Sequence, residues 1–333
     1  MNSIFSRTLK ALCAVMAATL LSACGGASST VDPFVATRVI AFGDGFNYVN
    51  GAGAGLSTVQ TGETDNTIAG RIAARYGIVV KRVADGATVL NPLASTGGFS
   101  YATANARVAD VDAQITAFLS SAGSVAKKDL IIIAVGNWDI YDAYTNGATS
   151  MESNASALVA SIQRLTTAGA EHVVVMPAIN MARTPWAANK SLAQIQKLSI
   201  TTGEVPGPTS FNLLLSTKLS ETYKSQDRKP VYLLDRTSDF NNFAGKFDTN
   251  GTTRIINVSG LALTADTGLY VPVCTAHTAM AGCALGGLDT TSPLTATSYQ
   301  SYVFADDINL TPLANRLLAD RMIYTMQTFG WAP

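Results

Sequence analysis

The feature that most constrains this chain is a series of short apolar runs separated by helix-like segments. The clearest run, DLIIIAVG at 129–136, is continuous and rich in β-branched residues, as strands buried in a parallel sheet are. Four more runs have this character: TRVIAFG (37–43), GIVVKRVA (77–84), HVVVMPAI (172–179) and PVYLLD (230–235). Strands that alternate with helices predict a parallel sheet with helices on both faces.

The intervening segments place apolar residues at helical spacing. On this basis helices are predicted at 108–120, 152–168, 211–224 and 312–328. Thr311 is a candidate N-cap of the last helix, and Pro312 suits its first turn. The stretch 236–300 is rich in Thr, Asn, Gly and Ser and is expected to form long loops with room for a hairpin. The predicted fold class is α/β, a three-layer α/β/α sandwich with a mainly parallel, flavodoxin-like sheet of about five strands.

Residues 1–23 have the features of a bacterial signal peptide. Arg7 and Lys10 form a short positive region, and ALCAVMAATLLS (11–22) forms an apolar region. That apolar region is too short to span a bilayer comfortably. We therefore expect this segment to be removed and to take no part in the fold.

The signal segment ends in LSAC, which resembles a bacterial lipobox with Cys24 as the acylated residue. Plain secretion, with Cys24 incidental, is the alternative. Two or more acyl chains anchor a protein stably, and Gly25 after the cysteine is typical of outer-membrane sorting. We expect residues 24–36 to form a flexible tether and residues 37–333 to form a single domain, held at the outer membrane and facing the periplasm or the outside.

Cys274 and Cys283 lie nine positions apart in a Gly/Ala/Thr-rich segment. In an exported protein this spacing favours a local disulfide. A metal site with His277 is the weaker interpretation, because two thiols and one imidazole make a poor zinc set. No metal and no cofactor are therefore expected.

The composition excludes nucleic acid as an expected partner. The chain has 23 Lys plus Arg and 23 Asp plus Glu, so its formal net charge is zero, and only 14% of its residues are charged. It has no basic stripe of the kind that tracks phosphate backbones. Its 47% of hydrophobic residues can fill one large core.

Five further segments occur in a defined order along the chain. They are FGDG (42–45), TDNTIAGRIAARYGI (64–78), GGFSYATANARV (97–108), IIAVGNWDIYD (132–142) and YVFADDINLTPLANRLLADRM (302–322). Together they resemble the sequence blocks of GDSL-type esterases and lipases of the SGNH hydrolase superfamily. This resemblance implies a flavodoxin-like fold and ester hydrolysis by a Ser–His–Asp triad.

The resemblance places two substitutions in the triad. Gly45 stands where the family has its serine nucleophile, and Asn309 stands where it has the histidine base, whereas Asp306 matches the aspartate. Glycine has no side chain that can form a covalent intermediate. An asparagine amide does not accept a proton near neutral pH, as imidazole does.

The oxyanion-hole positions also differ from the family pattern. Trp138 matches the asparagine of the third block, with Asn137 one position early. The glycine of the second block corresponds to Ala104 or Asn105, and the alignment does not decide which. The resemblance thus implies that most of the oxyanion hole is substituted as well.

Three further carboxylates, Asp44, Asp139 and Asp307, belong to segments expected around the cleft, together with Asp306. Two carboxylates at a suitable separation can do acid–base work on a glycosidic bond. Hydrogen bonding within their own turns is the favoured interpretation. His172, at the start of a predicted strand, is expected to face away from the cleft.

The favoured hypothesis is a catalytically inactive, lipid-anchored envelope protein of the SGNH fold that binds a glycan, an acyl ligand or a partner protein. An active esterase with a relocated catalytic group is the alternative. A purely structural envelope protein with a closed cleft is the third possibility.

Overall fold

The computed structural model describes nine stretches of the chain, which belong to one compact unit, Phe34–Pro333. They are residues 34–49, 66–83, 96–122, 125–199, 208–226, 229–244, 246–247, 254–255 and 303–333. The predictions for the signal segment, Cys24, the tether up to residue 33, His277 and the Cys274–Cys283 disulfide lie outside these stretches.

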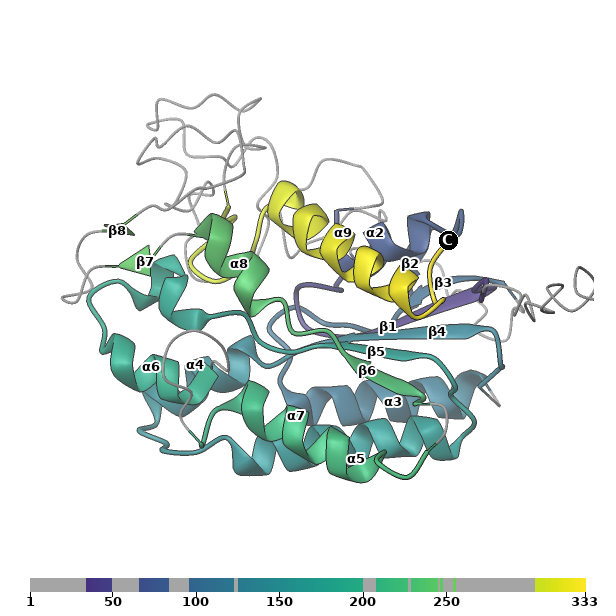
Figure 1. Ribbon diagram of the computed structural model, residues 1–333, viewed down its shortest axis with the longest axis horizontal. Coiled ribbons are helices and arrows are strands. Elements are labelled where there is room, and N and C mark those ends of the chain that lie inside the picture. The colour runs from purple at the N-terminus through teal and green to yellow at the C-terminus, as the bar shows by residue number, and fades with distance from the viewer. Residues whose placement is uncertain are drawn as a thin grey trace, which may run out of the picture. The chain divides into compact units, whose positions relative to one another are not determined.

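A six-stranded parallel sheet forms the centre of the fold (Figure 1). Its strands are β1 (Arg38–Gly43), β2 (Val80–Arg82), β3 (Gly97–Ser100), β4 (Asp129–Ala134), β5 (Val173–Met176) and β6 (Val231–Leu233). They lie in the order β2-β3-β1-β4-β5-β6. Every residue of β1 and of β4 is buried, which agrees with their continuous apolar sequences.

The sheet has one strand more than the five runs in the sequence predict. The additional strand is β3, whose sequence is Gly-Gly-Phe-Ser, and glycine weakens a strand pattern because it has no side chain to pack. The packing explains the glycine: a Cβ added at Gly98 would lie 2.6 Å from the carbonyl oxygen of Val79. The apolar sequence pattern therefore fails to predict β3, because close packing of β3 against β2 requires glycine.

Helices cover both faces of the sheet, with α2 and α9 on one face and α3, α5 and α7 on the other (Figure 1). Their bounds are α2 Ile68–Ala74, α3 Val108–Ala122, α5 Glu152–Thr167, α7 Phe211–Thr222 and α9 Pro312–Thr328. The four helices predicted from apolar spacing are confirmed, and Thr311 caps α9 by accepting a hydrogen bond from the N–H of Ala314. None of the described helices has both the length and the apolar character needed to cross a membrane.

Several short elements were not predicted from the sequence. They are α4 (Asn137–Thr145), α6 (Leu192–Ser199), α8 (Thr237–Ala244) and the 3₁₀ turns η1 (Met181–Arg183) and η2 (Pro185–Ala187). The stretch 236–300 was expected to form long loops with room for a hairpin. The helix α8 corrects this expectation, whereas the antiparallel pair β7 (Lys246–Phe247) and β8 (Arg254–Ile255) agrees with a hairpin there. Helices of two turns carry too few apolar positions to show a clear period.

The turn after β1 depends on a glycine. Gly43 has φ of +114°, and a Cβ there would lie 1.8 Å from the carbonyl oxygen of Ala134 on β4. Gln114 of α3 holds the same residue: its Oε1 accepts from the N–H of Gly43 at 2.7 Å, and its Nε2 donates to the Gly43 carbonyl at 3.0 Å. These contacts fix where the chain leaves β1, and so where Asp44 and Gly45 lie.

A buried ion pair joins the amino ends of β1 and β4. Arg38 donates from Nε to Asp129 Oδ1 at 2.7 Å and from Nη2 to Oδ2 at 2.5 Å. The side chains of Arg38 and Asp129 are 5% and 0% exposed. Asp129 also accepts from the N–H of Ala126, so the carboxylate is satisfied on several sides, as a buried charge requires.

We expect Asp129→Asn to lower the free energy of unfolding by about 3–5 kcal/mol, because it leaves a buried guanidinium without its counter-charge. Urea denaturation of both proteins measures the change. Lys127→Gln is the control, since Lys127 is 87% exposed and lies 3.9 Å from Glu171; its effect should stay below about 0.5 kcal/mol. Equal losses in the two variants would contradict the role given to the buried pair.

Candidate active-site region

Three of the motif segments meet beyond the carboxyl ends of β1, β3 and β4. The N–H of Thr103, after β3, donates to the carbonyl of Gly43 at the end of β1 at 3.1 Å. The N–H of Val108, at the start of α3, donates to Asp139 of α4 at 3.1 Å. This is the edge at which doubly wound sheets bind their ligands.

The last motif segment holds Asp306 and Asn309 in direct contact. Asn309 donates from Nδ2 to Asp306 Oδ2 at 2.9 Å and to Oδ1 at 3.2 Å, and each residue is 3% exposed. The backbone N–H groups of Ile308 and Asn309 also donate to Oδ1, at 2.8 and 2.6 Å. An imidazole N–H makes the corresponding contact with the aspartate of a triad. Here an amide N–H makes it.

Burial raises the pKa of Asp306 above its ordinary value, while the hydrogen bonds from Asn309 and Ile308 favour the ionised form. The surrounding donors are all supplied by the same loop. The carboxylate is therefore used to hold the segment that leads into α9.

Gly45 lies in a buried turn that Asp44 organises. The N–H of Phe46 donates to Asp44 Oδ1 at 3.1 Å, and the N–H groups of Asn47 and Tyr48 donate to the Asp44 carbonyl. An aspartate that accepts from the backbone two residues further on is a common turn device. Gly45 itself is buried and presents no side-chain atom at the position where the family resemblance places the nucleophile.

His172 lies at the far end of the sheet from Asp306. It precedes β5, and its ring stacks on Phe34 at a centroid distance of 3.7 Å and meets Trp331 edge-on at 4.7 Å. Its position agrees with the expectation that it faces away from the cleft. Within the described stretches, then, no imidazole lies near Asp306.

The second-block positions show one feature of a glycine site. Asn105 has φ of +58°, a left-handed conformation that glycine adopts most readily and asparagine tolerates. Its neighbour Ala104 is half-buried and has no such conformation. The backbone geometry therefore favours Asn105 over Ala104 as the counterpart of the family glycine. The Oδ1 atom of Asn105 is buried and has no hydrogen-bond partner in the described part of the chain.

The two third-block candidates have different surroundings. Asn137 is buried, and its Oδ1 accepts from the N–H of Ile179 at 3.1 Å, which ties α4 to the segment after β5. Trp138 is 7% exposed and packs against Tyr141 at a centroid distance of 5.4 Å. The guanidinium of Arg107 lies 5.4 Å from the centre of the Trp138 ring. Trp138 Nε1 has no hydrogen-bond partner among the described residues.

A row of aromatic rings continues from Trp138. Tyr141 lies 5.3 Å from Trp186, and Tyr144 meets Trp186 edge-on at 5.4 Å. The N–H of Trp186 donates to the backbone carbonyl of Asp307 at 3.0 Å. The row thus links the third and last motif segments.

Two buried carboxylates belong to the first and third motif segments. Asp139 accepts from the N–H of Val108 and from Asn154 Nδ2, the latter at 2.7 Å, and burial raises its pKa to about 6. Asp44 is 2% exposed, its Oδ2 has no partner among the described residues, and burial raises its pKa to about 8. The charge of Asp139 adds to the shift of Asp44, so Asp44 is mainly protonated at neutral pH.

Asp307 plays no part in this carboxylate pair: it is half-buried and is placed by the backbone contact with Trp186. Across the described stretches, no three His, Cys, Asp or Glu side chains come together to hold a metal ion.

The model of the GDSL-like Lipase/Acylhydrolase family matches residues 39–322. The chain belongs to this family. Among solved structures, a "putative arylesterase" from Agrobacterium tumefaciens str. C58 is similar at 11% sequence identity and a TM-score of 0.37, over 88% of this chain and 99% of that one. No curated protein matches the chain.

Some residues that hold the GDSL-family segments together were not singled out from the sequence. Gln114 clamps Gly43, and Asn154 donates to Asp139, from the two helices α3 and α5. Arg107 pairs with Asp142 at 2.8 Å and covers Trp138. Gln114 is only 7% exposed although it is polar. A polar residue at a helical position that the apolar spacing predicts to be buried is the one sequence signal for a residue that holds other segments by hydrogen bonds.

We expect the free energy of unfolding of Asp44→Asn to increase relative to that of the wild type as pH rises. The unfolded-state pKa of an aspartate is about 3.9, and that of Asp44 in the fold is about 8. Between these values the folded state binds the extra proton, so the stability of the wild type falls with rising pH. The slope for one proton is about 1.4 kcal/mol per pH unit at most.

Urea denaturation of both proteins at pH 4.5, 6 and 7.5 measures this difference, and Asp320→Asn at an exposed position is the surface control. Asn at position 44 keeps an oxygen for the Phe46 N–H, so the turn is preserved. A difference between wild type and variant that is constant with pH would show that Asp44 does not titrate in this window.

Proposed function

We propose that this GDSL-family chain is a catalytically inactive member, anchored by lipid in the bacterial envelope, that binds a glycan, an acyl ligand or a partner protein. The observation that carries the proposal is the contact between Asn309 and Asp306. An amide occupies the position where the family resemblance places the base, and Gly45 offers no hydroxyl at the position where it places the nucleophile.

The chemistry lost by these two substitutions is large. Acyl transfer needs a nucleophile that forms a covalent intermediate and a base that accepts its proton. Loss of either group from a triad costs about 10⁶ in kcat, and the remaining catalysis comes largely from the oxyanion hole. In this chain the bulky indole of Trp138, with a single N–H, stands at the position where the family resemblance places the asparagine donor, so that residual contribution is weakened too.

Unpartnered polar atoms support a binding role for the same region. Asp44 Oδ2 and Trp138 Nε1 are buried without hydrogen-bond partners in the described part of the chain, and such groups cost free energy unless a ligand or water satisfies them. Hydroxyl groups both donate and accept, which suits a glycan. The half-buried rings of this row, Tyr141 and Tyr144, offer stacking surface to a sugar ring or an acyl chain. Fluorescence titration with short glycans and with fatty-acyl chains separates the two ligand classes.

An active esterase with a relocated catalytic group is the second candidate, and the family match over residues 39–322 favours it. It requires a hydroxyl close to a base. Ser100, the serine at the end of β3, is buried and donates from Oγ to the backbone carbonyl of Asn47 at 2.7 Å. That hydrogen bond commits its proton to the fold, which makes Ser100 a poor nucleophile.

We expect the wild-type protein to show no covalent labelling by a fluorophosphonate probe and no turnover of short p-nitrophenyl esters above background. The double variant Gly45→Ser/Asn309→His is the matched positive control, because it restores both groups in their family positions. Gain of a general base contributes about 10²-fold or more, so the double variant should exceed Gly45→Ser alone. Labelling of the wild type at one serine would establish the active-esterase alternative.

The lipid anchor has its own test. We expect the wild type to sediment with membranes and to incorporate a radiolabelled fatty acid, and Cys24→Ser to lose both properties, because serine cannot form the thioether. Cys13→Ser, inside the apolar region of the signal segment, is the control and should leave both unchanged. A wild-type protein found only in the soluble fraction would contradict anchoring.

A further inference from the structure

Strand β6 ends the sheet, and no strand in the described stretches pairs with its outer edge. The N–H of Val173 donates to the carbonyl of Pro230, and the N–H of Leu234 donates to the carbonyl of Val175, each at 2.8 Å. The backbone polar groups of Pro230 and Leu234 therefore point toward β5. Because backbone groups alternate along a strand, Val231 and Leu233 direct theirs outward. In the described stretches no residue beyond β5 hydrogen-bonds to them.

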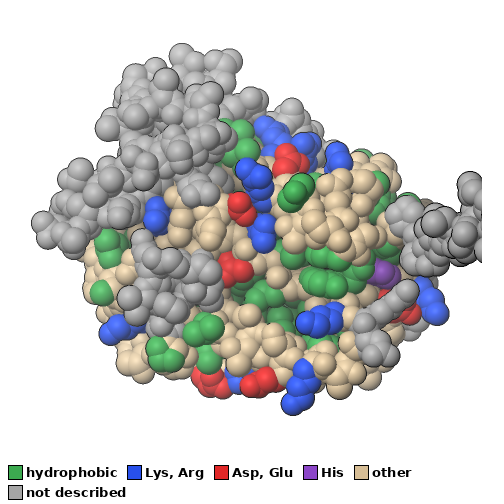
Figure 2. Space-filling model, viewed as in Figure 1, with side chains coloured by type: hydrophobic (Ala, Val, Ile, Leu, Met, Phe, Trp, Pro, Cys, Tyr) green, Lys and Arg blue, Asp and Glu red, His purple; other side chains and the backbone are tan. Residues whose placement is uncertain are grey.

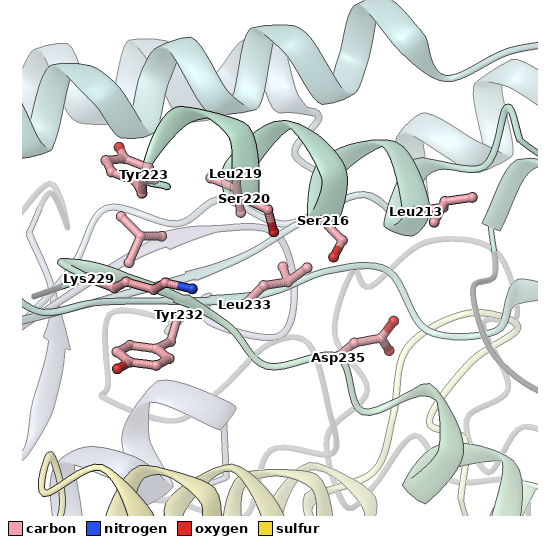
Figure 3. A pocket seen from close by; sticks show the side chains of 10 residues that line it. Leu213, Ser216, Leu219, Ser220, Tyr223, Lys229, Tyr232, Leu233 and Asp235 are labelled. Atoms are coloured by element: carbon pink, nitrogen blue, oxygen red, sulfur yellow. The ribbon is translucent and has the colours of Figure 1, made fainter. Parts of the chain in front are cut away.

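A groove of about 440 Å³ runs along this edge, between β6 and α7. Leu213, Ser216, Ser220 and Leu233 line it, and Figure 3 shows Lys229 and Asp235 at its opposite ends. Figure 2 shows hydrophobic side chains gathered on the face that carries β6 and the end of α9. An open strand edge beside apolar surface is a template for pairing with another strand.

The charges of this edge are arranged symmetrically about Tyr232. Lys229 lies three residues before Tyr232 and Asp235 lies three residues after it. If two copies pair antiparallel about a two-fold axis at Tyr232, Lys229 of each copy faces Asp235 of the partner subunit. Val231 then faces Leu233 of the partner subunit, and both direct N–H and C=O groups outward, as a hydrogen-bonded antiparallel pair requires.

Among the described residues, the backbone of Pro230 and the serines of α7 are compatible with this pairing. Pro230 lacks an N–H, but its backbone faces β5, so no outward donor is missing. Ser216 and Ser220 lie one turn apart on α7 and line the groove. Since a two-fold axis perpendicular to the sheet keeps each face on its own side, the two copies of α7 would lie side by side, with small side chains between them.

We propose that β6 is a homodimer interface, at which two copies pair their β6 edges antiparallel and continue one sheet across both subunits. Self-complementary charge favours a second copy over a foreign strand. One end of the groove carries Lys229 and the other carries Asp235, whose carboxylate also accepts from the N–H of Thr237 at 2.8 Å. An isologous contact places each of these charges opposite its counter-charge. Lys229 forms no ion pair within the described part of the chain, so its charge is available to a partner.

Sedimentation velocity on the protein lacking residues 1–24 tests this interface, since the described residues from Phe34 onward form their own compact unit. The wild type should be a dimer. Lys229→Asp alone and Asp235→Lys alone should each raise the dimer dissociation constant by about tenfold or more, because each places like charges opposite one another twice. An equimolar mixture of the two variants should recover the dimer, since every facing pair is then of opposite charge.

Lys127→Asp, at an exposed position that is part of neither β6 nor the groove lining, is the matched control and should leave the dissociation constant unchanged. Circular dichroism on each variant confirms that it is folded, and recovery in the mixture excludes misfolding as the cause of dissociation. A monomeric wild type would overturn the proposal. A dimer that persists in both single variants would also overturn it, because the contact would then lie on another surface.

Discussion

The close approach of β1 to β4 at Gly43 determines where the motif residues lie. No side chain fits at Gly43, since a Cβ would lie 1.8 Å from the Ala134 carbonyl oxygen, and Gln114 holds the same peptide from the opposite side. The turn that carries Asp44 and Gly45 therefore begins beside the start of α4, where Asn137 and Trp138 follow. The Arg38–Asp129 ion pair secures the other end of the same two strands.

The buried carboxylates of the motif segments support the fold through hydrogen bonds to the backbone. Asp44, Asp139 and Asp306 each accept backbone hydrogen bonds in their own or a neighbouring segment. These contacts need a carboxylate or an amide and do not need catalysis, so they keep their use when the nucleophile and base are substituted. The GDSL-family architecture is thus compatible with the loss of ester hydrolysis.

Sequence periodicity predicted the long elements well and the short ones poorly. The helices α3, α5, α7 and α9 and five of the six strands follow from apolar spacing, because their burial is continuous over many residues. The strand β3 was missed because its two glycines are required by close packing against β2. The helices α4, α6 and α8 were missed because two turns hold too few apolar positions to reveal a period.

The sequence by itself determined the fold class and the identities of the residues at positions 45, 306 and 309, since apolar period and motif order are local properties of the chain. Only the tertiary structure decided that the Asn309 amide bonds to Asp306 and that Asp44 keeps a buried oxygen without a partner in the described residues. It also decided that β6 is the last of the described strands at its end of the sheet. Burial and hydrogen-bond partners are contributed by segments far apart in sequence, and no local pattern records which of them will meet.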